Sequence, residues 1–105
     1  MTIIKGTTPT IEYTFSTVDT ADIAEAILSI KQYNKTVIER DISTATVDTG
    51  VMSWKLTQRE SLRLNEKVPA TIYLSYVLSD GTRAEGATVE AEIDPTGKEA
   101  VIGDE

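Results

Sequence analysis

The sequence predicts an all-β protein, an antiparallel sandwich of about seven strands with one short helical link. Three observations predict it: apolar and polar residues alternate in several short runs, turn residues separate these runs at short spacing, and no internal repeat is visible. A chain of 105 residues, 40% hydrophobic and 26% charged, can bury a real core in one domain. We therefore expect a β-sandwich domain over residues 1–94 and an acidic C-terminal tail over 95–105.

The first clear strand contains Ile11, Tyr13 and Phe15, which alternate with polar residues as in a half-buried strand. Pro9 precedes it, at a position where proline does not interrupt a ladder. The N-terminal run Thr2 to Lys5 is short and is expected to complete a sheet edge.

The segment from Asp22 to Tyr33 is ambiguous, because Ile23, Ile27 and Ile30 recur at helical spacing among good helix formers. Asn34-Lys35 follows it, and asparagine tolerates the positive φ of a tight hairpin turn. We therefore interpret the segment as a strand that turns at Asn34-Lys35.

The run from Val51 to Leu56 places Met52, Trp54 and Leu56 on one face, which makes Trp54 the expected core anchor. Thr57 followed three residues later by Glu60 has the form of a capping box. We expect one or two helical turns to begin there.

The last hairpin is predicted around Asp80-Gly81, a dipeptide typical of a two-residue type I′ turn. With such a turn, Ile72 lies opposite Val89 and Leu74 lies opposite Ala87. One face then collects an apolar stripe: Ile72, Leu74, Ala87, Val89, Ala91 and Ile93.

Composition excludes several function classes. The chain has no cysteine and no histidine, which removes disulfides, thiolate and imidazole metal ligands and the usual general base near neutral pH. The net charge of −7 argues against nucleic acid as a partner. No apolar stretch is long enough to cross a bilayer, and the N-terminus lacks the apolar run of a signal peptide, so we expect no membrane contact and synthesis in the cytoplasm.

Glu90, Glu92 and Asp94 alternate along the last strand and are the candidate carboxylates for a catalytic pair or a calcium site. A solvated outer face is the favoured interpretation, because Ala91 and Ile93 occupy the opposite side. We therefore assign no catalytic, cofactor-binding or metal-ligating residue, and we expect no cofactor.

Two further features suggest binding. The four tyrosines, Tyr13, Tyr33, Tyr73 and Tyr76, suggest a carbohydrate platform, but their spacing favours packing in a core or an interface. Residues 80–105, which include the last strand and the tail, carry eight acidic and two basic side chains. The short apolar run at 100–102 lies in this acidic tail and is either a docking peptide or a frayed end.

Three stretches carry a family resemblance: Gly6-Thr7-Thr8-Pro9-Thr10, the link from Leu56 to Leu62, and Ser79-Asp80-Gly81-Thr82 with a trailing Val101-Ile102. In these three stretches taken together, the chain resembles small virion structural proteins of phages and prophages of Gram-positive bacteria, similar to the N-terminal domain of the upper baseplate protein. The resemblance covers most of the chain, rests on turns and strand patterns, and transfers no binding residue.

The resemblance implies an immunoglobulin-like sandwich in a tail or baseplate, with no enzymatic activity and no cofactor. Its implied location is the virion, after synthesis in the host cytoplasm. Its implied partners are other virion proteins and copies of itself, with no small-molecule substrate. The alternative is a carbohydrate-binding adhesion or capsid decoration module; an enzyme would need two facing carboxylates in a cleft.

Overall fold

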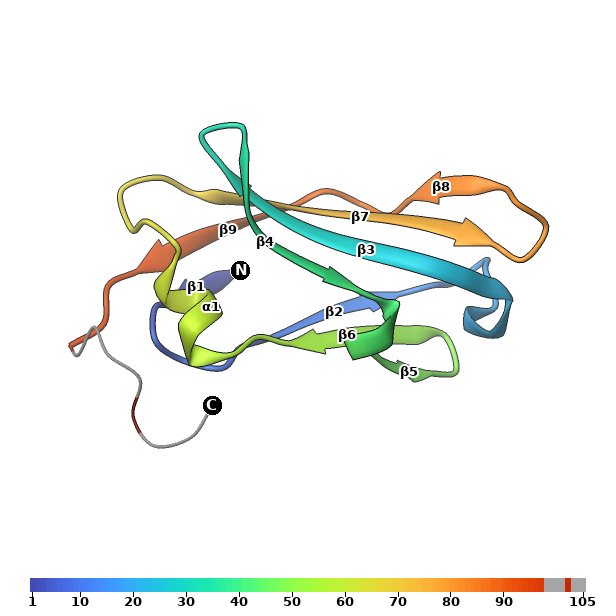
Figure 1. The fold of residues 1–105 in the computed structure, drawn as a ribbon, viewed down its shortest axis with the longest axis horizontal. Helices are drawn as coiled ribbons and strands as arrows, with labels where there is room; N and C mark the ends of the chain where they lie inside the picture. Colours follow the sequence, from blue (N-terminus) through green and yellow to red (C-terminus); the bar gives the residue numbers. More distant parts are fainter. Residues whose placement is uncertain (98–101, 103–105) are drawn as a thin grey trace.

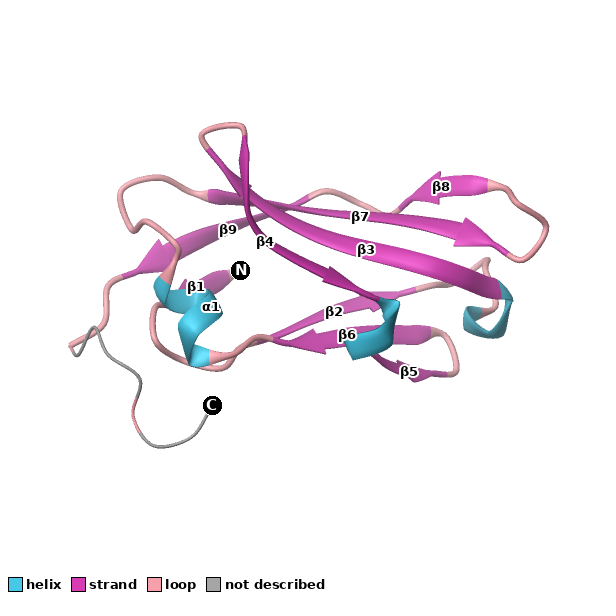
Figure 2. Cartoon of the chain, viewed as in Figure 1, coloured by secondary structure: helices cyan, strands magenta, loops and turns pink. Residues whose placement is uncertain are grey.

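Two β-sheets face each other in the computed structural model, which describes residues 1–97 and 102 (Figures 1 and 2). The strands are β1 (Thr2–Ile4), β2 (Thr10–Thr14), β3 (Ile23–Gln32), β4 (Lys35–Asp41), β5 (Thr46–Asp48), β6 (Val51–Lys55), β7 (Ala70–Leu78), β8 (Arg83–Glu85) and β9 (Val89–Asp94). Helix α1 (Gln58–Leu62) and the 3-10 turns η1 (Thr20–Asp22) and η2 (Ile42–Thr44) connect them.

The strand order is that of an immunoglobulin-like sandwich. The larger sheet runs β1-β9-β7-β3-β4, with β8 also paired to β7, and the smaller sheet runs β2-β6-β5. The chain therefore changes sheets between β1 and β2, between β2 and β3, between β4 and β5, and between β6 and β7, as immunoglobulin domains do. All pairs are antiparallel except β1 with β9. The predicted fold class is confirmed.

The core lies between the sheets and is built by alternation along each strand. Leu28, Ile30 and Ile72 from the larger sheet face Met52 and Trp54 from the smaller one, and all five side chains are buried. Trp54 is fully buried, as predicted, and its indole Nε1–H donates a 2.9 Å hydrogen bond to the carbonyl oxygen of Asp41. A buried indole therefore keeps its polar group paired.

The ambiguous segment is a strand, and a bulge explains its helical spacing. Against β7, the register shifts between Ile23 and Glu25, so that Ala24 is an extra residue and both Ala24 and Glu25 are exposed. Ile23 and Ile30 consequently point inward while Ile27 points outward and is 42% exposed. A bulge inserts one residue into a strand, so the side chains before and after it exchange faces. The spacing of the three isoleucines therefore reflects a bulged strand and not a helix.

The turn after this strand lies one residue earlier than predicted. Gln32 pairs with Lys35, which leaves Tyr33 and Asn34 as the two turn residues. Both have positive φ, 53° and 59°, as a type I′ turn requires. Asn34 has the expected conformation, but the prediction of Asn34-Lys35 as the turn is wrong.

The last hairpin departs from its predicted turn. The backbone N–H of Leu78 donates to the carbonyl of Thr82 at 2.8 Å, which makes the loop three residues long with Gly81 at φ 90°. Near this loop Tyr76 lies opposite Ala84, one position away from the predicted register. Such a loop with a left-handed glycine is the second common hairpin geometry, so the two-residue turn is wrong.

The predicted register returns after Gly86. Ile72 lies opposite Val89 as expected, because the register shifts by one position between Gly86, whose N–H donates to the Leu74 carbonyl at 2.9 Å, and Val89. Ala87 is exposed instead of lying opposite Leu74, which corrects that part of the stripe. Gly86 permits a close approach: a Cβ there would lie 3.2 Å from the ring of Tyr13, so the ring would have to shift, and the Tyr13 hydroxyl donates to the Ala87 carbonyl at 3.1 Å.

The predicted capping box is confirmed at the start of α1. Thr57 Oγ1 accepts from the backbone N–H of Glu60 at 3.1 Å, and Glu60 Oε1 accepts from the N–H of Thr57 at 2.9 Å. The buried hydroxyl of Ser61 then donates to the Thr7 carbonyl at 2.7 Å and accepts from the N–H of Gly6 at 3.0 Å. Helix α1 thus fixes the link that follows β1.

Replacing Trp54 tests its role in joining the sheets. We expect Trp54→Phe to lower the free energy of unfolding by about 1–3 kcal/mol, because it removes the hydrogen bond to Asp41 and leaves space in the core. Urea unfolding followed by far-UV circular dichroism measures it. The exposed substitution Lys55→Ala is the control and should change stability by less than about 0.5 kcal/mol. Equal stabilities of the two variants would contradict the role.

Candidate functional site

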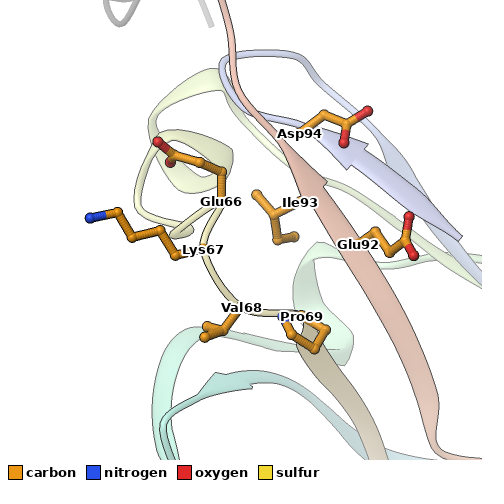
Figure 3. A pocket seen from close by; sticks show the side chains of 7 residues that line it. All are labelled: Glu66, Lys67, Val68, Pro69, Glu92, Ile93 and Asp94. Atoms are coloured by element: carbon orange, nitrogen blue, oxygen red, sulfur yellow. The ribbon is translucent and has the colours of Figure 1, made fainter.

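The three candidate carboxylates lie on the outer face of β9. Glu90, Glu92 and Asp94 are all exposed, and Glu92 and Asp94 line a shallow hollow of about 310 Å³ together with the link Glu66–Pro69 (Figure 3). In Figure 3 the side chains of Glu66 and Glu92 point in different directions from opposite sides of the hollow. Within residues 1–97 and 102, no group of three or more histidine, cysteine, aspartate or glutamate residues could hold a metal ion.

An ion pair fastens the start of the chain beside this hollow. Lys5 Nζ lies 3.1 Å from Glu66 Oε2, and the backbone N–H of Lys5 donates to the Asp94 carbonyl at 3.0 Å. The pKa of Glu66 lies below its ordinary value, chiefly because the carboxylate accepts a hydrogen bond from the backbone N–H of the same residue, and then because of the Lys5 ammonium. The carboxylate therefore acts as a structural anchor for the loop.

A buried amide fixes the other side of the same loop. The Gln32 side chain, 5% exposed, donates to the carbonyls of Asn65 (2.8 Å) and Val68 (3.1 Å) and accepts from the N–H of Asn65 (2.8 Å). Sequence reasoning missed this group. The sequence feature that could have indicated it is a polar residue, Gln32, at an inward position of β3 that continues the alternation of Leu28 and Ile30.

Strand β1 forms one margin of the larger sheet, as predicted for the N-terminal run. It pairs with β9 on one side, with Thr2 opposite Glu92 and Ile4 opposite Asp94. On its other side it has no partner strand in the described part of the chain. Met1 is 52% exposed and Ile4 is 47% exposed. This margin combines unpaired backbone with apolar side chains, the combination that a neighbouring chain can pair with.

The tyrosines divide between core and surface. Tyr13 and Tyr76 are 8% exposed, while Tyr33 and Tyr73 are 64% and 39% exposed, so Tyr73 and Tyr76 occupy opposite faces of β7. Lys31 Nζ lies 5.3 Å from the centre of the Tyr73 ring. Tyr73 pairs with Ser29 of β3. Tyr33 follows Ser29 by four positions in the sequence, which corresponds to roughly 13 Å along a strand. The two exposed rings therefore form no continuous surface.

The predicted docking peptide falls mostly outside the described residues. Ala100 and Val101 lie there, as does most of the predicted tail. Ile102 is described: its N–H donates to Gln58 Oε1 at 2.8 Å, and its carbonyl accepts from Gln58 Nε2 at 2.9 Å. Its side chain is 68% exposed.

Comparison with known proteins gives a likeness of fold. No protein-family model matches the chain, and no curated protein matches it. CopC from Methylosinus trichosporium OB3b is similar, with a TM-score of 0.58 and 18% identity over 92% of this chain and 87% of that one. The immunoglobulin-like domain of mouse leukocyte-associated immunoglobulin-like receptor 1, in a strand-swapped dimer, has a TM-score of 0.49 and 13% identity over 89% and 85%.

The described residues include no helix with the length and apolar character that spanning a membrane requires. At the identities found, the two solved structures concern the fold alone. The geometry of the described residues favours the margins of the larger sheet over a cleft as the candidate site.

The Glu66 anchor predicts a pH-dependent stability. Because its pKa is lower in the folded than in the unfolded chain, the carboxylate stabilises the fold above about pH 4.5, and this contribution is lost as the pH falls through the folded pKa. We expect Glu66→Gln to lower the urea midpoint at pH 7 and to have little effect at pH 3. A midpoint difference that is the same at both pH values would contradict the anchor.

Proposed function

We propose that this chain is a non-enzymatic structural protein of a phage or prophage particle, associated with the tail or baseplate. It acts through contacts between its sheet margins and other virion proteins, including copies of itself. The observation that carries the proposal is the β1 margin, where unpaired backbone lies next to the exposed side chains of Met1 and Ile4.

The absence of a convergent polar site in the described residues supports a role in contact over a role in chemistry. The exposed carboxylates of β9 lie at alternate positions on the outer face of one strand, and Glu66 is paired with Lys5. Catalysis by two carboxylates would need them to face each other across a cleft. The family resemblance adds the particle context to this geometry.

A rigid margin suits such a role. Lys5, Gly6 and Thr7 are fixed by Glu66, Ser61 and the end of β9, so β1 presents its free side in a defined geometry. Pre-organisation lowers the entropy that a partner must lose on binding. An assembly protein that must join neighbours in one orientation benefits from this property.

Carbohydrate binding is the second candidate, and Tyr33 is the observation that favours it. Its ring is 64% exposed at the tip of the hairpin between β3 and β4. If the hairpin binds host-wall polysaccharide, Tyr33→Ala should abolish a binding signal in calorimetry while Tyr73→Ala retains it. No heat of binding for the unchanged protein would remove this candidate.

Incorporation into particles tests the first candidate. We expect the protein to co-purify with intact particles and Ile4→Lys to lower its copy number about tenfold, because a buried lysine at the margin costs on the order of 1.4 kcal/mol. Quantitative mass spectrometry of purified particles measures both. Val47→Lys, at a residue of similar exposure (42%) on the smaller sheet, is the matched control.

The outcomes separate two claims. If the unchanged protein is missing from intact particles, the particle role is wrong. If it is present and the two lysine variants are incorporated equally, the particle role stands and the β1 margin is not the contact.

A further inference from the structure

Strand β3 continues past the point where its neighbour leaves the sheet. The last pair between them joins Ile27 to Asp41, after which residues 42–44 form the turn η2 instead of extending β4. In Figure 1, β3 runs on beyond the end of β4 toward η1. Residues 23–26 pair with β7 on one side, and on the other side no strand among the described residues pairs with them.

Two hollows border this unpaired stretch. One, of about 310 Å³, lies between β3 and η2 and is lined by Glu25, Ala26, Ile27, Asp41, Ile42 and Ser43. The other, of about 190 Å³, lies on the outer face, where the same β3 residues meet Val77 and Arg83. We call the stretch 23–27 together with residues 42–43 the β3 notch. It offers backbone hydrogen-bonding groups with apolar surface on both sides.

The charge around the larger hollow favours a basic partner there, while the smaller hollow has Arg83 as well as Glu25 in its lining. The two charged residues that line the larger hollow, Glu25 and Asp41, are both acidic. Hydrogen bonds from the side chain and then the backbone of Ser43 hold the pKa of Asp41 below its ordinary value, so it stays ionised. Asp22 and Asp80 line a further hollow at the same end of β3. A second copy of this chain, with its net charge of −7, is a poor match for this surface.

We infer that the β3 notch receives an extended segment of another protein, in which basic residues alternate with small apolar residues. The segment adds to the sheet in the row that β4 vacates, antiparallel to β3. Its backbone pairs with residues 23–26, its apolar side chains contact Ala26 and Ile42, and its basic side chains lie near Glu25 and Asp41. This inference is independent of the particle role.

The bulge at Ala24 limits the length of this pairing. Bulges disrupt a ladder locally, and Ile27 already pairs with Asp41, so the incoming strand has regular geometry only along residues 25–26. Affinity must therefore come from the side chains in the hollows and from charge as well as from the ladder. That requirement explains why the predicted partner needs a defined pattern and why any exposed strand would not suffice.

Labelled synthetic peptides test the inference with the whole chain. The probe is an eight-residue peptide of alternating lysine and valine, measured by fluorescence anisotropy. Two matched peptides replace valine by proline, which keeps the charge but removes ladder donors, or replace lysine by glutamate. The protein variants are Glu25→Lys and, as a control with the same charge change on the smaller sheet, Glu12→Lys. Circular dichroism verifies that both variants fold.

We expect the lysine–valine peptide to bind, and the proline and glutamate peptides to bind at least about tenfold more weakly. Glu25→Lys should weaken binding about tenfold, and Glu12→Lys should change it less than about twofold. Amide hydrogen exchange of residues 24–26 should slow when the peptide is added. Equal binding of the valine and proline peptides, equal losses in the two variants, or no binding of the lysine–valine peptide would overturn the inference.

Discussion

The fold depends on how the end of β4 is fastened to the smaller sheet. Trp54 donates its indole hydrogen bond to the Asp41 carbonyl, and Arg40 donates to the Lys55 carbonyl at 3.2 Å. Arg40 also pairs with Glu60 at 2.7 Å, with both side chains less than one-fifth exposed. These contacts draw β4 away from β3 and toward the other sheet at one defined residue. They close the sandwich at this side and, as a consequence, leave the remainder of β3 unpaired.

Asp41 combines three functions at this corner. Its carbonyl accepts from Trp54, its backbone forms the last pair with β3 opposite Ile27, and its carboxylate caps η2 by accepting from the N–H of Ser43 at 2.9 Å. The Ser43 hydroxyl donates to the same carboxylate oxygen. A side chain that satisfies the first free N–H groups of a helical turn favours the end of a strand at that point. Local capping thus ends β4 at the same residue at which the long-range contact from Trp54 holds it.

Local patterns predicted the elements that depend on near neighbours. The alternation from Met52 to Leu56 and the reciprocal hydrogen bonds of Thr57 and Glu60 involve residues within four positions of each other, and both are observed. The strand from Ile23 was predicted for the right reason, because its turn contains an asparagine at positive φ. What the pattern did not show was the bulge at Ala24, which is set by pairing with β7.

Errors of one residue mark the places where tertiary contacts set the register. The hairpin loop after β7 gained one residue, and the interruption at residues 86–88 compensated for it, so that Ile72 still met Val89. Gly86 was the available signal, since an isolated glycine in a strand often marks a bulge or a close approach. The close approach is made by Tyr13, which comes from the other sheet, and no local pattern contains that contact.

The sequence could predict that sheet margins are exposed, but it could not predict which margin remains unpaired. That choice depends on long-range contacts, above all on where Trp54 and Arg40 hold β4. The charge of an unpaired margin then determines which partner strands it attracts and which it repels. On the outer face of β9, which is paired with β1 and β7, Glu90, Glu92 and Asp94 lie at alternate positions, and two such faces would repel each other if they stacked. The same excess of acid at Glu25 and Asp41 discourages pairing between copies at the notch while it attracts a basic strand. One electrostatic property thus opposes aggregation through the open edge and selects a partner for it.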